Sequence, residues 1–320
     1  MQLPPSPSRD DWPSIRREFT GWPVIMGEIC ARHGLASGEL TPAASGTNVV
    51  FTSADHVVKL YPPMWTGAAV GEHAVLEHLA GRLALETPKV VAAGSFDAWR
   101  YLVVTRLTGI WLSEVWDSLD TSARCGLAAQ LGATLRDLHA LPIGKLADIP
   151  MLSERWPRVT LRPVKETVAH HQRQGIEETW LAQLAVFLEH RPPLCPEPFS
   201  PVLIHGDIHP WHLLAARDGE SWRLTGLVDF DDAMLGWTEY EFASPGVLML
   251  AGDAASIETC LRAYGFGERD LNAGLRRRLM VYALLNRYWG LDVLLEYGDP
   301  NHRCATLEEL ERAIFPIGLE

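Results

Sequence analysis

The stretch from residue 202 to 232 constrains this chain most, because it places charged and metal-ligating side chains around predicted strands. A short apolar run leads into a polar loop that carries Asp207 and His212. A second apolar run, the turn sequence Arg-Asp-Gly-Glu and a returning apolar run then lead to Asp229. This pattern predicts a β-hairpin, which would bring Asp207 and Asp229 to the same end of the ladder. Two carboxylates in that layout can hold a divalent metal and a reacting hydroxyl beside a phosphate chain.

The same stretch resembles the signature of the aminoglycoside phosphotransferase and choline kinase-like family, which are small-molecule kinases with a protein-kinase-like fold. The resemblance is carried by His-Gly-Asp at 205–207, a ligand-type side chain at His212 and an acid at Asp229. It implies that Asp207 orients and deprotonates the attacking hydroxyl, and that Asp229 is the principal Mg²⁺ ligand with help from His212. The family usually has Asn at the position of His212. Because Mg²⁺ prefers oxygen ligands, His212 could bind metal weakly, select a softer ion or only hydrogen-bond a phosphate.

Bulk composition narrows the class of partner. The chain has 320 residues, of which 47% are hydrophobic and 21% charged, as is ordinary for a soluble protein. Its formal net charge of −12 argues against a nucleic-acid partner and suits a cationic substrate. We expect no membrane partner and a cytoplasmic location, because no apolar run is long enough to cross a bilayer. The five scattered cysteines form neither a paired metal spacing nor a disulfide framework.

Two predicted strands near the N-terminus are typical of a nucleotide site. The turn between them consists of four small or polar residues, Ser45, Gly46, Thr47 and Asn48. Such residues let backbone amides approach phosphates, and Lys59 on the second strand can reach the α- and β-phosphates. A predicted helix over 66–83 offers Glu72 and Glu77. The resemblance assigns to Glu72 the role of holding the lysine, with Glu77 as the alternative, and over 45–79 it is closest to hygromycin B kinases.

The composition changes after the strand predicted at 101–105, which indicates a boundary between two lobes. The resemblance implies a hinge here whose backbone groups bind the purine, at Arg106, Leu107 and Thr108. We predict a flexible tail over 1–10, a nucleotide-binding N-lobe over 11–107 and a helical C-lobe over 108–320. The predicted fold class is α+β, with a small antiparallel sheet plus a helix in the N-lobe of a bilobal, protein-kinase-like fold.

Several helices can be predicted from periodicity alone. One amphipathic helix is expected over 14–31 despite a Gly-Trp-Pro interruption, and another over 121–139 with Thr121 or Ser122 as its cap. A further helical stretch is expected over 271–295. His170 and His171 are adjacent and would point to different faces of a helix, so they make a poor metal site.

The segment 234–243 is a second departure from the family pattern. The family has a Gly-Asp-Pro segment here, followed by an acidic helix start, whereas this chain has Trp237 in place of the Asp. Glu241 could take over the later acidic position. In the family this segment supports the catalytic loop, so the replacement bears on that support more than on the chemistry. We expect His205 to brace the loop by hydrogen bonding.

These observations predict a small-molecule kinase that transfers the γ-phosphoryl group of ATP or GTP, with Mg²⁺, to a hydroxyl of a cationic substrate such as hygromycin B. Asp231, Asp232 and His209 are the predicted substrate contacts. One alternative is a kinase of another hydroxyl metabolite, such as an amino alcohol, a sugar or a macrolide. The others are a nucleotide-binding pseudokinase, and a metal-dependent hydrolase that uses the histidines and the aspartate of 205–212.

Overall fold

The computed structural model describes residues 3–4, 6–36, 40–44 and 46–318 of the chain. They pack as two compact units. The first contains the residues up to Thr108 together with Gly226–Asp232, and the second contains Gly109–Thr225 and the residues from Ala233 onward. The sequence did not predict that the segment around Asp229 would pack with the N-terminal unit. The lobe boundaries predicted from the sequence stay a prediction.

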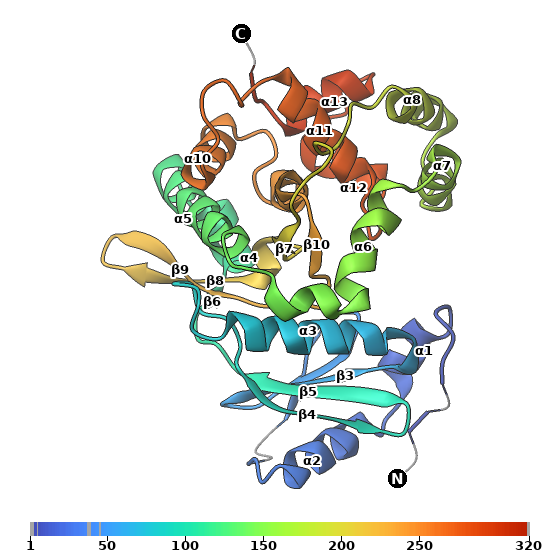
Figure 1. Cartoon of the computed structure of the whole chain (residues 1–320), viewed down its shortest axis with the longest axis vertical. Coiled ribbons are helices and arrows are strands. Elements are labelled where there is room, and N and C mark those ends of the chain that lie inside the picture. Colours follow the sequence, from blue (N-terminus) through green and yellow to red (C-terminus); the bar gives the residue numbers. More distant parts are fainter. Residues whose placement is uncertain (1–2, 5, 37–39, 45, 319–320) are drawn as a thin grey trace. The chain divides into compact units, whose positions relative to one another are not determined.

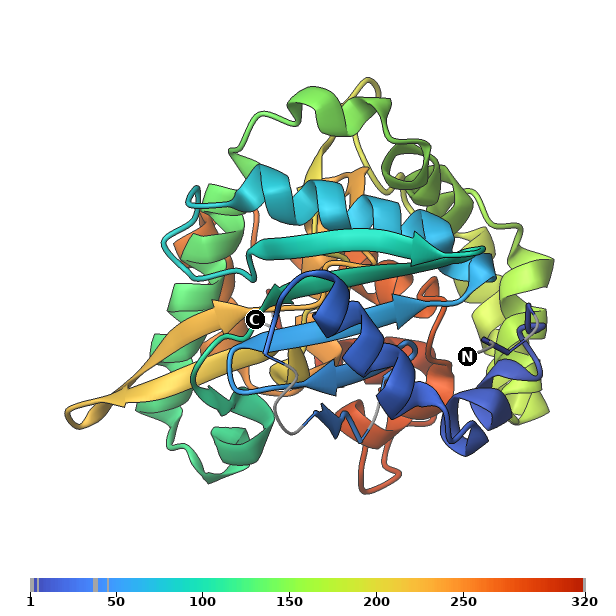
Figure 2. The same ribbon diagram turned by 90° about the horizontal axis from the view of Figure 1, so that it is seen from below.

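The first unit is built on an antiparallel sheet in the order β1-β2-β3-β5-β4. Its strands are β1 (Thr41–Pro42), β2 (Val49–Thr52), β3 (His56–Tyr61), β4 (Val90–Phe96) and β5 (Trp99–Thr105). Its helices are α1 (Trp12–Glu18), α2 (Trp22–Arg32) and α3 (Thr66–Leu79). Helices α2 and α3 cover opposite faces of the sheet (Figures 1 and 2). Together with the helix-rich second unit, this sheet confirms the predicted α+β class.

Alternation along β3 decides which side chains meet which helix, because successive strand residues point to opposite faces. Val58 and Leu60 are fully buried in a hydrophobic cluster that includes Ile25, Met26 and Ile29 of α2. The intervening residues of β3 therefore point to the α3 face. This places Lys59 and Tyr61 where a polar side chain of α3 can reach them.

The single helix expected over 14–31 is wrong, since the chain forms two helices there, α1 and α2. Pro23 stands at the start of α2, where the missing backbone N–H costs nothing, but the same residue cannot continue a helix from before it. The break lets Trp12 and Trp22 turn toward Trp99 of β5, with ring centroids 5.6 and 5.7 Å from that of Trp99. Burial of these aromatic rings anchors both short helices on the sheet.

The second unit is mostly helical (Figure 1). Its helices are α4 (Leu112–Val115), α5 (Thr121–His139), α6 (Pro150–Thr160), α7 (Val164–Arg173), α8 (Glu178–Glu189), α9 (Ala243–Leu248), α10 (Ala254–Tyr264), α11 (Ala273–Leu284), α12 (Leu291–Gly298) and α13 (Leu307–Ile314). Its strands are β6 (Ile110–Trp111), β7 (Val202–Ile204), β8 (Leu213–Asp218), β9 (Ser221–Leu227) and β10 (Met234–Gly236), with β9 continuing into the first unit. Strands β8 and β9 form the predicted hairpin, and β7 pairs with β10. No helix among the residues described here is long and apolar enough to cross a membrane.

Helix α5 is capped by Asp120, whose side chain accepts a hydrogen bond from the backbone N–H of Ala123, and not by Thr121 or Ser122 as expected. The aspartate one position earlier has the extended backbone that a cap requires. The helix packs closely on α10 at Gly132. A Cβ atom there would lie 2.0 Å from the carbonyl oxygen of Cys260, so this contact requires glycine.

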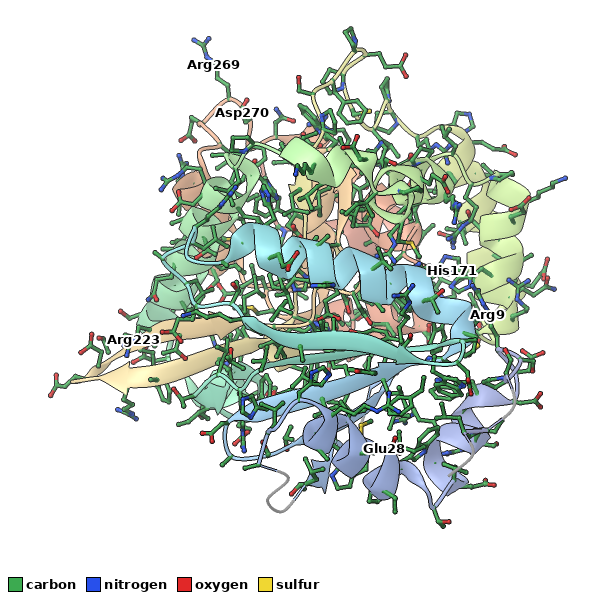
Figure 3. All side chains as sticks on the ribbon, turned by 60° about the horizontal axis from the view of Figure 1, so that its bottom comes forward. Arg9, Glu28, His171, Arg223, Arg269 and Asp270 are labelled. Carbon is green, nitrogen blue, oxygen red and sulfur yellow. The ribbon has the colours of Figure 1, made fainter. Side chains whose placement is uncertain are left out.

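The helical stretch expected over 271–295 is interrupted between α11 and α12. His171 of α7 joins the two helices, because its Nδ1 accepts the N–H of Leu291 at 2.8 Å and its Nε2 contacts the carbonyl oxygen of Leu284 at 3.0 Å. Figure 3 labels His171. It also labels Arg223, an exposed residue of the β8–β9 hairpin. Burial lowers the pKa of His171, which keeps the ring neutral. Both ring nitrogens are thus used by backbone groups, as befits a structural histidine.

Candidate functional site

The buried lysine of the first unit is held by an ion pair with α3. Lys59 Nζ donates to both carboxylate oxygens of Glu72, at 2.8 and 2.7 Å. Both side chains are buried, with exposed fractions of 8% and 3%. The competing candidate, Glu77, is exposed and lies 3.3 Å from His73. The structure therefore brings Glu72, and not Glu77, to the lysine.

Tyr61 is a third member of this group that the sequence analysis missed. Its hydroxyl donates to Glu72 Oε2, and its ring centroid lies 5.6 Å from Lys59 Nζ. Burial and the neighbouring Glu72 carboxylate raise the pKa of Tyr61 well above its usual value, so the hydroxyl stays a donor. The available signal was its spacing, because a residue two positions after Lys59 on a strand shares its face.

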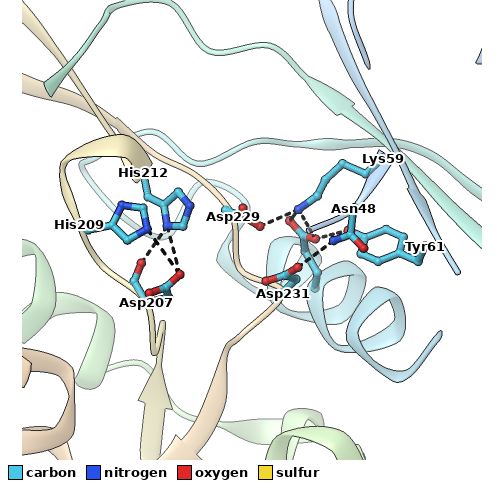
Figure 4. Close-up of polar contacts among 9 residues, drawn as sticks. Asn48, Lys59, Tyr61, Asp207, His209, His212, Asp229 and Asp231 are labelled. Carbon is cyan, nitrogen blue, oxygen red and sulfur yellow. Dashed lines mark hydrogen bonds and ion pairs between the residues drawn. The ribbon is translucent and has the colours of Figure 1, made fainter. Parts of the chain in front are cut away.

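Asp229 is the second carboxylate at the lysine. Its Oδ1 accepts a hydrogen bond from Lys59 Nζ at 2.7 Å, as Figure 4 shows. Burial alone would lower the pKa of Lys59, but Asp229 and Glu72 raise it well above the usual value, so the side chain carries a full positive charge. Asp229 has a φ of 69°, a left-handed conformation that is uncommon outside glycine and better tolerated by Asp than by most residues. Such conformations are concentrated at functional sites.

The predicted phosphate turn is tied to the segment around Asp229 within the same unit. Asn48 Nδ2 donates to Asp231 Oδ2 at 2.9 Å. The carbonyl oxygen of Thr47 accepts the indole N–H of Trp12 at 2.8 Å. Gly46 has a φ of 112°, which favours glycine, and Ser45 lies outside the described residues. The turn that precedes β2 is therefore fixed at Thr47 and Asn48.

The three predicted hinge residues follow β5. Arg106 anchors them, because its backbone N–H donates to the carbonyl oxygen of Asp55 and its guanidinium donates to that of Ser53, both at 2.8 Å. Leu107 is half-buried and Thr108 is exposed. Their purine contacts stay a prediction.

In the second unit, the loop that follows β7 is held from beneath by a buried carboxylate. Glu241 accepts the backbone N–H groups of His205 at 2.7 Å and Gly206 at 2.9 Å, and only 1% of the residue is exposed. Its Oε2 also lies 3.4 Å from Nε2 of His139. Glu241 thus supports the loop that carries Asp207, in a chain where Trp237 stands in place of the usual Asp. His205 braces the same loop, since its Nδ1 accepts the N–H of Asp207 at 3.3 Å.

Asp207 emerges from this support beside two imidazoles. His209 Nε2 lies 3.5 Å and His212 Nδ1 lies 3.8 Å from Asp207 Oδ2, and Figure 4 shows the two rings together on one side of the carboxylate. Burial would raise the pKa of Asp207, but contact with His209 and the nearby rings of His212 and His205 lower it below its ordinary value. The carboxylate is therefore ionised near neutral pH, so it can accept a hydrogen bond from a hydroxyl group.

The remaining predicted substrate contacts differ in exposure. Asp232 is buried, whereas Asp231 is half-buried and bonded to Asn48. His209 is half-buried beside Asp207. Their roles toward a substrate stay predictions.

Asp229 and His212, the two predicted metal ligands, differ in how well their donor atoms suit a magnesium ion. Asp229 offers carboxylate oxygens, which Mg²⁺ prefers. His212 offers nitrogen, and its Nδ1 lies 2.8 Å from the carbonyl oxygen of Asp207. Asp229 therefore suits Mg²⁺, and His212 suits a softer ion.

Comparison with solved structures identifies the fold. The chain is similar to aminoglycoside 2'-phosphotransferase-IIIa in its GDP complex, with a TM-score of 0.68 and 20% identity over 91% of this chain and 97% of that one. It is similar to the macrolide 2'-phosphotransferase MphH from Brachybacterium faecium, with a TM-score of 0.58 and 20% identity over 92% and 99%. A thermostable mutant of aminoglycoside phosphotransferase APH(4)-Ia matches with a TM-score of 0.56 and 18% identity over 89% and 94%. These matches confirm the predicted kinase-like fold.

The family is shown by the sequence itself. Residues 39–277 match the phosphotransferase enzyme family, which is well over half of the chain. The match includes the Lys59, Glu72 and Asp229 group as well as the loop that carries Asp207. The chain therefore belongs to the phosphotransferase enzyme family, as the resemblance of its motifs predicted.

Proposed function

We propose that this protein transfers the γ-phosphoryl group of ATP or GTP to a hydroxyl of a small cationic molecule, an aminoglycoside-type antibiotic such as hygromycin B. The observation that carries the proposal is the lysine held between two carboxylates, with Nζ 2.7 Å from both Glu72 Oε2 and Asp229 Oδ1. A fully charged lysine in this position neutralises phosphate charge, which is the main protein contribution to phosphoryl transfer.

In the proposed nucleotide site, Lys59 contacts the α- and β-phosphates and Glu72 keeps it in place. The backbone of the turn Ser45–Asn48 approaches the phosphates, and the backbone of Arg106–Thr108 binds the base. Asp229 would hold Mg²⁺, which would supply charge neutralisation at the phosphates. In the structure Asp229 accepts a hydrogen bond from Lys59. When nucleotide and metal bind, Asp229 would contact the metal and Lys59 would contact the phosphates.

On the acceptor side, Asp207 orients the hydroxyl and receives its proton as the bond to phosphorus forms. The lowered pKa of Asp207 suits this role, because an ionised carboxylate accepts a hydrogen bond from the hydroxyl before transfer. Most of the rate acceleration comes from positioning and charge stabilisation, so a strong base is not needed. His205 and Glu241 hold the loop that fixes the direction of the carboxylate.

Charge and similarity support the proposed acceptor class. The net charge of −12 favours a polycationic acceptor, and Asp231, Asp232 and His209 are the proposed contacts. Similar folds occur in a GDP and kanamycin complex and in a streptomycin-ATP complex of aminoglycoside phosphotransferases. A similar fold also occurs in a macrolide phosphotransferase, which supports a test of uncharged sugars on macrolides as well.

The proposal is tested by release of ADP or GDP from each nucleotide with Mg²⁺, across hygromycin B, other aminoglycosides and macrolides. We expect release that depends on an acceptor and falls by at least about 1,000-fold in Asp207→Ala. Asp218→Ala on the exposed end of β8 is the matched control and should leave the rate within about twofold.

Two results would overturn the proposal in different ways. Nucleotide binding without release for any acceptor in the panel contradicts the antibiotic assignment, and a wider screen of hydroxyl metabolites then separates an orphan kinase from a pseudokinase. Equal rates in Asp207→Ala and wild type would contradict the assignment of the proton acceptor, whatever the substrate.

A further inference from the structure

The 205–212 loop carries a cluster of three side chains that can each ligate a metal ion. Asp207, His209 and His212 each offer one ligand atom, and these atoms all lie within 4.8 Å of one another. All three residues come from eight consecutive positions that Glu241 and His205 hold in place. In the proposed reaction Asp207 accepts the proton and His209 contacts the substrate, whereas neither imidazole takes part in the proton transfer.

The spacing of the cluster is that of metal ligands more than of hydrogen bonds. The distance of 3.5 Å from His209 Nε2 to Asp207 Oδ2 is long for a charged hydrogen bond. Two ligands with bonds of about 2.0–2.1 Å to one tetrahedral ion stand about 3.4 Å apart. Side-chain movements of about 1 Å would therefore bring the three atoms, which lie within 4.8 Å of one another, into one coordination sphere.

The hydrogen bonding of the two rings supports this. His212 Nδ1 lies 2.8 Å from the backbone oxygen of Asp207, so it carries the proton and Nε2 carries the lone pair. Imidazoles that bind metals usually donate their other N–H in this way, which orients the ring. In the neighbouring ring, Nε2 of His209 is the nitrogen that faces the carboxylate, 3.5 Å from Asp207 Oδ2.

The donor set selects the kind of ion. Two imidazole nitrogens and one carboxylate oxygen suit Zn²⁺, Co²⁺ or Ni²⁺, whereas Mg²⁺ prefers oxygen ligands and an octahedral shell. The rings of His209 and His212 have centroids 3.7 Å apart, so both stay on the same side of the carboxylate. The Asn usual at position 212 would supply an amide oxygen and no imidazole, so the His212 departure creates this donor set.

We propose that Asp207, His209 and His212 form a site for one borderline divalent cation of the Zn²⁺ class, and that this ion inhibits the enzyme. An ion on Asp207 occupies the carboxylate that orients the acceptor hydroxyl, and it prevents that carboxylate from taking the proton. The inhibition rests on the proposed function, but binding of the ion does not. Mg²⁺ at Asp229 and Zn²⁺ at this cluster would then have opposite effects on turnover.

Binding is tested with Co²⁺ alone on the full-length, metal-stripped protein, because Co²⁺ in a zinc-type site gives visible d–d absorption bands. We expect a titration that saturates at one equivalent and is competed by Zn²⁺ and not by Mg²⁺. The affinity should fall at least tenfold in His209→Ala and His212→Asn, since loss of a ligand costs more than the roughly 10- to 100-fold seen for outer-shell partners. His190→Ala, an exposed histidine of the same unit, is the matched control and should keep full affinity.

Inhibition is measured as the fraction of each protein's own turnover that Zn²⁺ removes at fixed Mg²⁺ and nucleotide. Wild type and His190→Ala should lose most of their own turnover at Zn²⁺ concentrations at which His212→Asn keeps most of its own turnover. A melting curve of each variant verifies that it is folded before metal is added.

Each further outcome counts against one part of the proposal. Absence of Co²⁺ bands, or bands of equal strength in His209→Ala and His212→Asn, overturns the site. Bands that behave as expected, with no inhibition by Zn²⁺, overturn the blocking role alone. If no acceptor is ever phosphorylated while the bands follow the variants as expected, the proposed function fails and the metal site stands.

Discussion

The carboxylate of Glu241 accepts the backbone N–H of His205 at 2.7 Å, and the adjoining N–H of Gly206 at 2.9 Å. One buried side chain thereby fixes two successive peptide units immediately before Asp207. Gly206 has a φ of 87°, so the backbone turns sharply at the same point. This support fixes the backbone from which the Asp207 side chain extends.

Glu241→Gln should reduce both stability and turnover. A glutamine presents one N–H₂ group to donors that need acceptors, so at least one of the two loop bonds is lost. The free energy of unfolding should fall by about 1–3 kcal/mol, the usual cost of an unsatisfied buried group. We expect kcat to fall by about 10- to 100-fold, because small displacements of a catalytic side chain are costly. Chemical denaturation and steady-state kinetics measure the two effects.

The control for this variant is Glu239→Gln. Glu239 is also buried, but its carboxylate accepts from the guanidinium of Arg278 at 2.6 and 2.8 Å. It should lose a comparable amount of stability and keep kcat within about threefold. A similar loss of kcat in both variants would mean that stability, and not loop geometry, limits turnover.

Glu72→Gln should raise the KM for nucleotide by about tenfold or more. The neutral amide cannot balance the charge of Lys59, which would then be drawn to Asp229 alone and away from the phosphates. Glu77→Gln, on the exposed face of the same helix, should change the KM by less than about twofold. Nucleotide titrations at saturating acceptor separate the two residues, and equal effects would contradict the assignment.

Tyr61→Phe should weaken nucleotide binding more mildly. The change removes only the hydroxyl that donates to Glu72, so the carboxylate keeps Lys59 but is less firmly held. We expect a three- to tenfold rise in the KM for nucleotide, equivalent to about 1 kcal/mol, with kcat little changed. Tyr101→Phe removes a hydroxyl that contacts His33 in the same unit, and its KM should match that of the wild type. A shift in kcat alone would argue against a positioning role for Tyr61.

Several strands of both units could be predicted from the sequence, because their signals are local. The compact apolar run at 57–60 in the first unit and the turn at Arg-Asp-Gly-Glu in the second each specify a strand or a hairpin within a few residues. The choice of Glu72 over Glu77 came from resemblance, and the contact of Glu72 with Lys59 depends on the register between α3 and β3. That register is set by packing across the sheet, which no local pattern reveals.

Other features escaped prediction for physical reasons. Tyr61 reads as an ordinary buried strand residue until the position of Glu72 is known. The break between α11 and α12 depends on His171, more than 100 residues earlier, whose nitrogens contact Leu284 and Leu291. A long-range partner of this kind leaves no trace in the periodicity of 271–295.

Gly132→Ala should destabilise the second unit even though alanine is the better helix former. The gain in helix propensity is about 1 kcal/mol. A Cβ atom would meet the backbone oxygen of Cys260 at 2.0 Å, and backbone cannot move aside as a flexible side chain can. Overpacking costs about 1–3 kcal/mol or more, so we expect a net loss, measured by denaturation. Gly126→Ala in the same helix has open space around its Cβ and should be stabilising, which makes it a direct control.

We expect His171 to make the stability of the protein depend on pH. Burial lowers the pKa of His171 below 6.5. A second proton on the ring would also abolish the hydrogen bond that Nδ1 accepts from Leu291. Below about pH 6.5 the unfolded chain therefore binds a proton that the folded chain does not, so stability falls as pH falls through this range. The contribution is at most about 1.4 kcal/mol per pH unit. His171→Gln should lower stability at about pH 7.5 and show a shallower decline toward about pH 5.5. Parallel declines in the two proteins would mean that His171 titrates normally and that the sensitivity arises elsewhere.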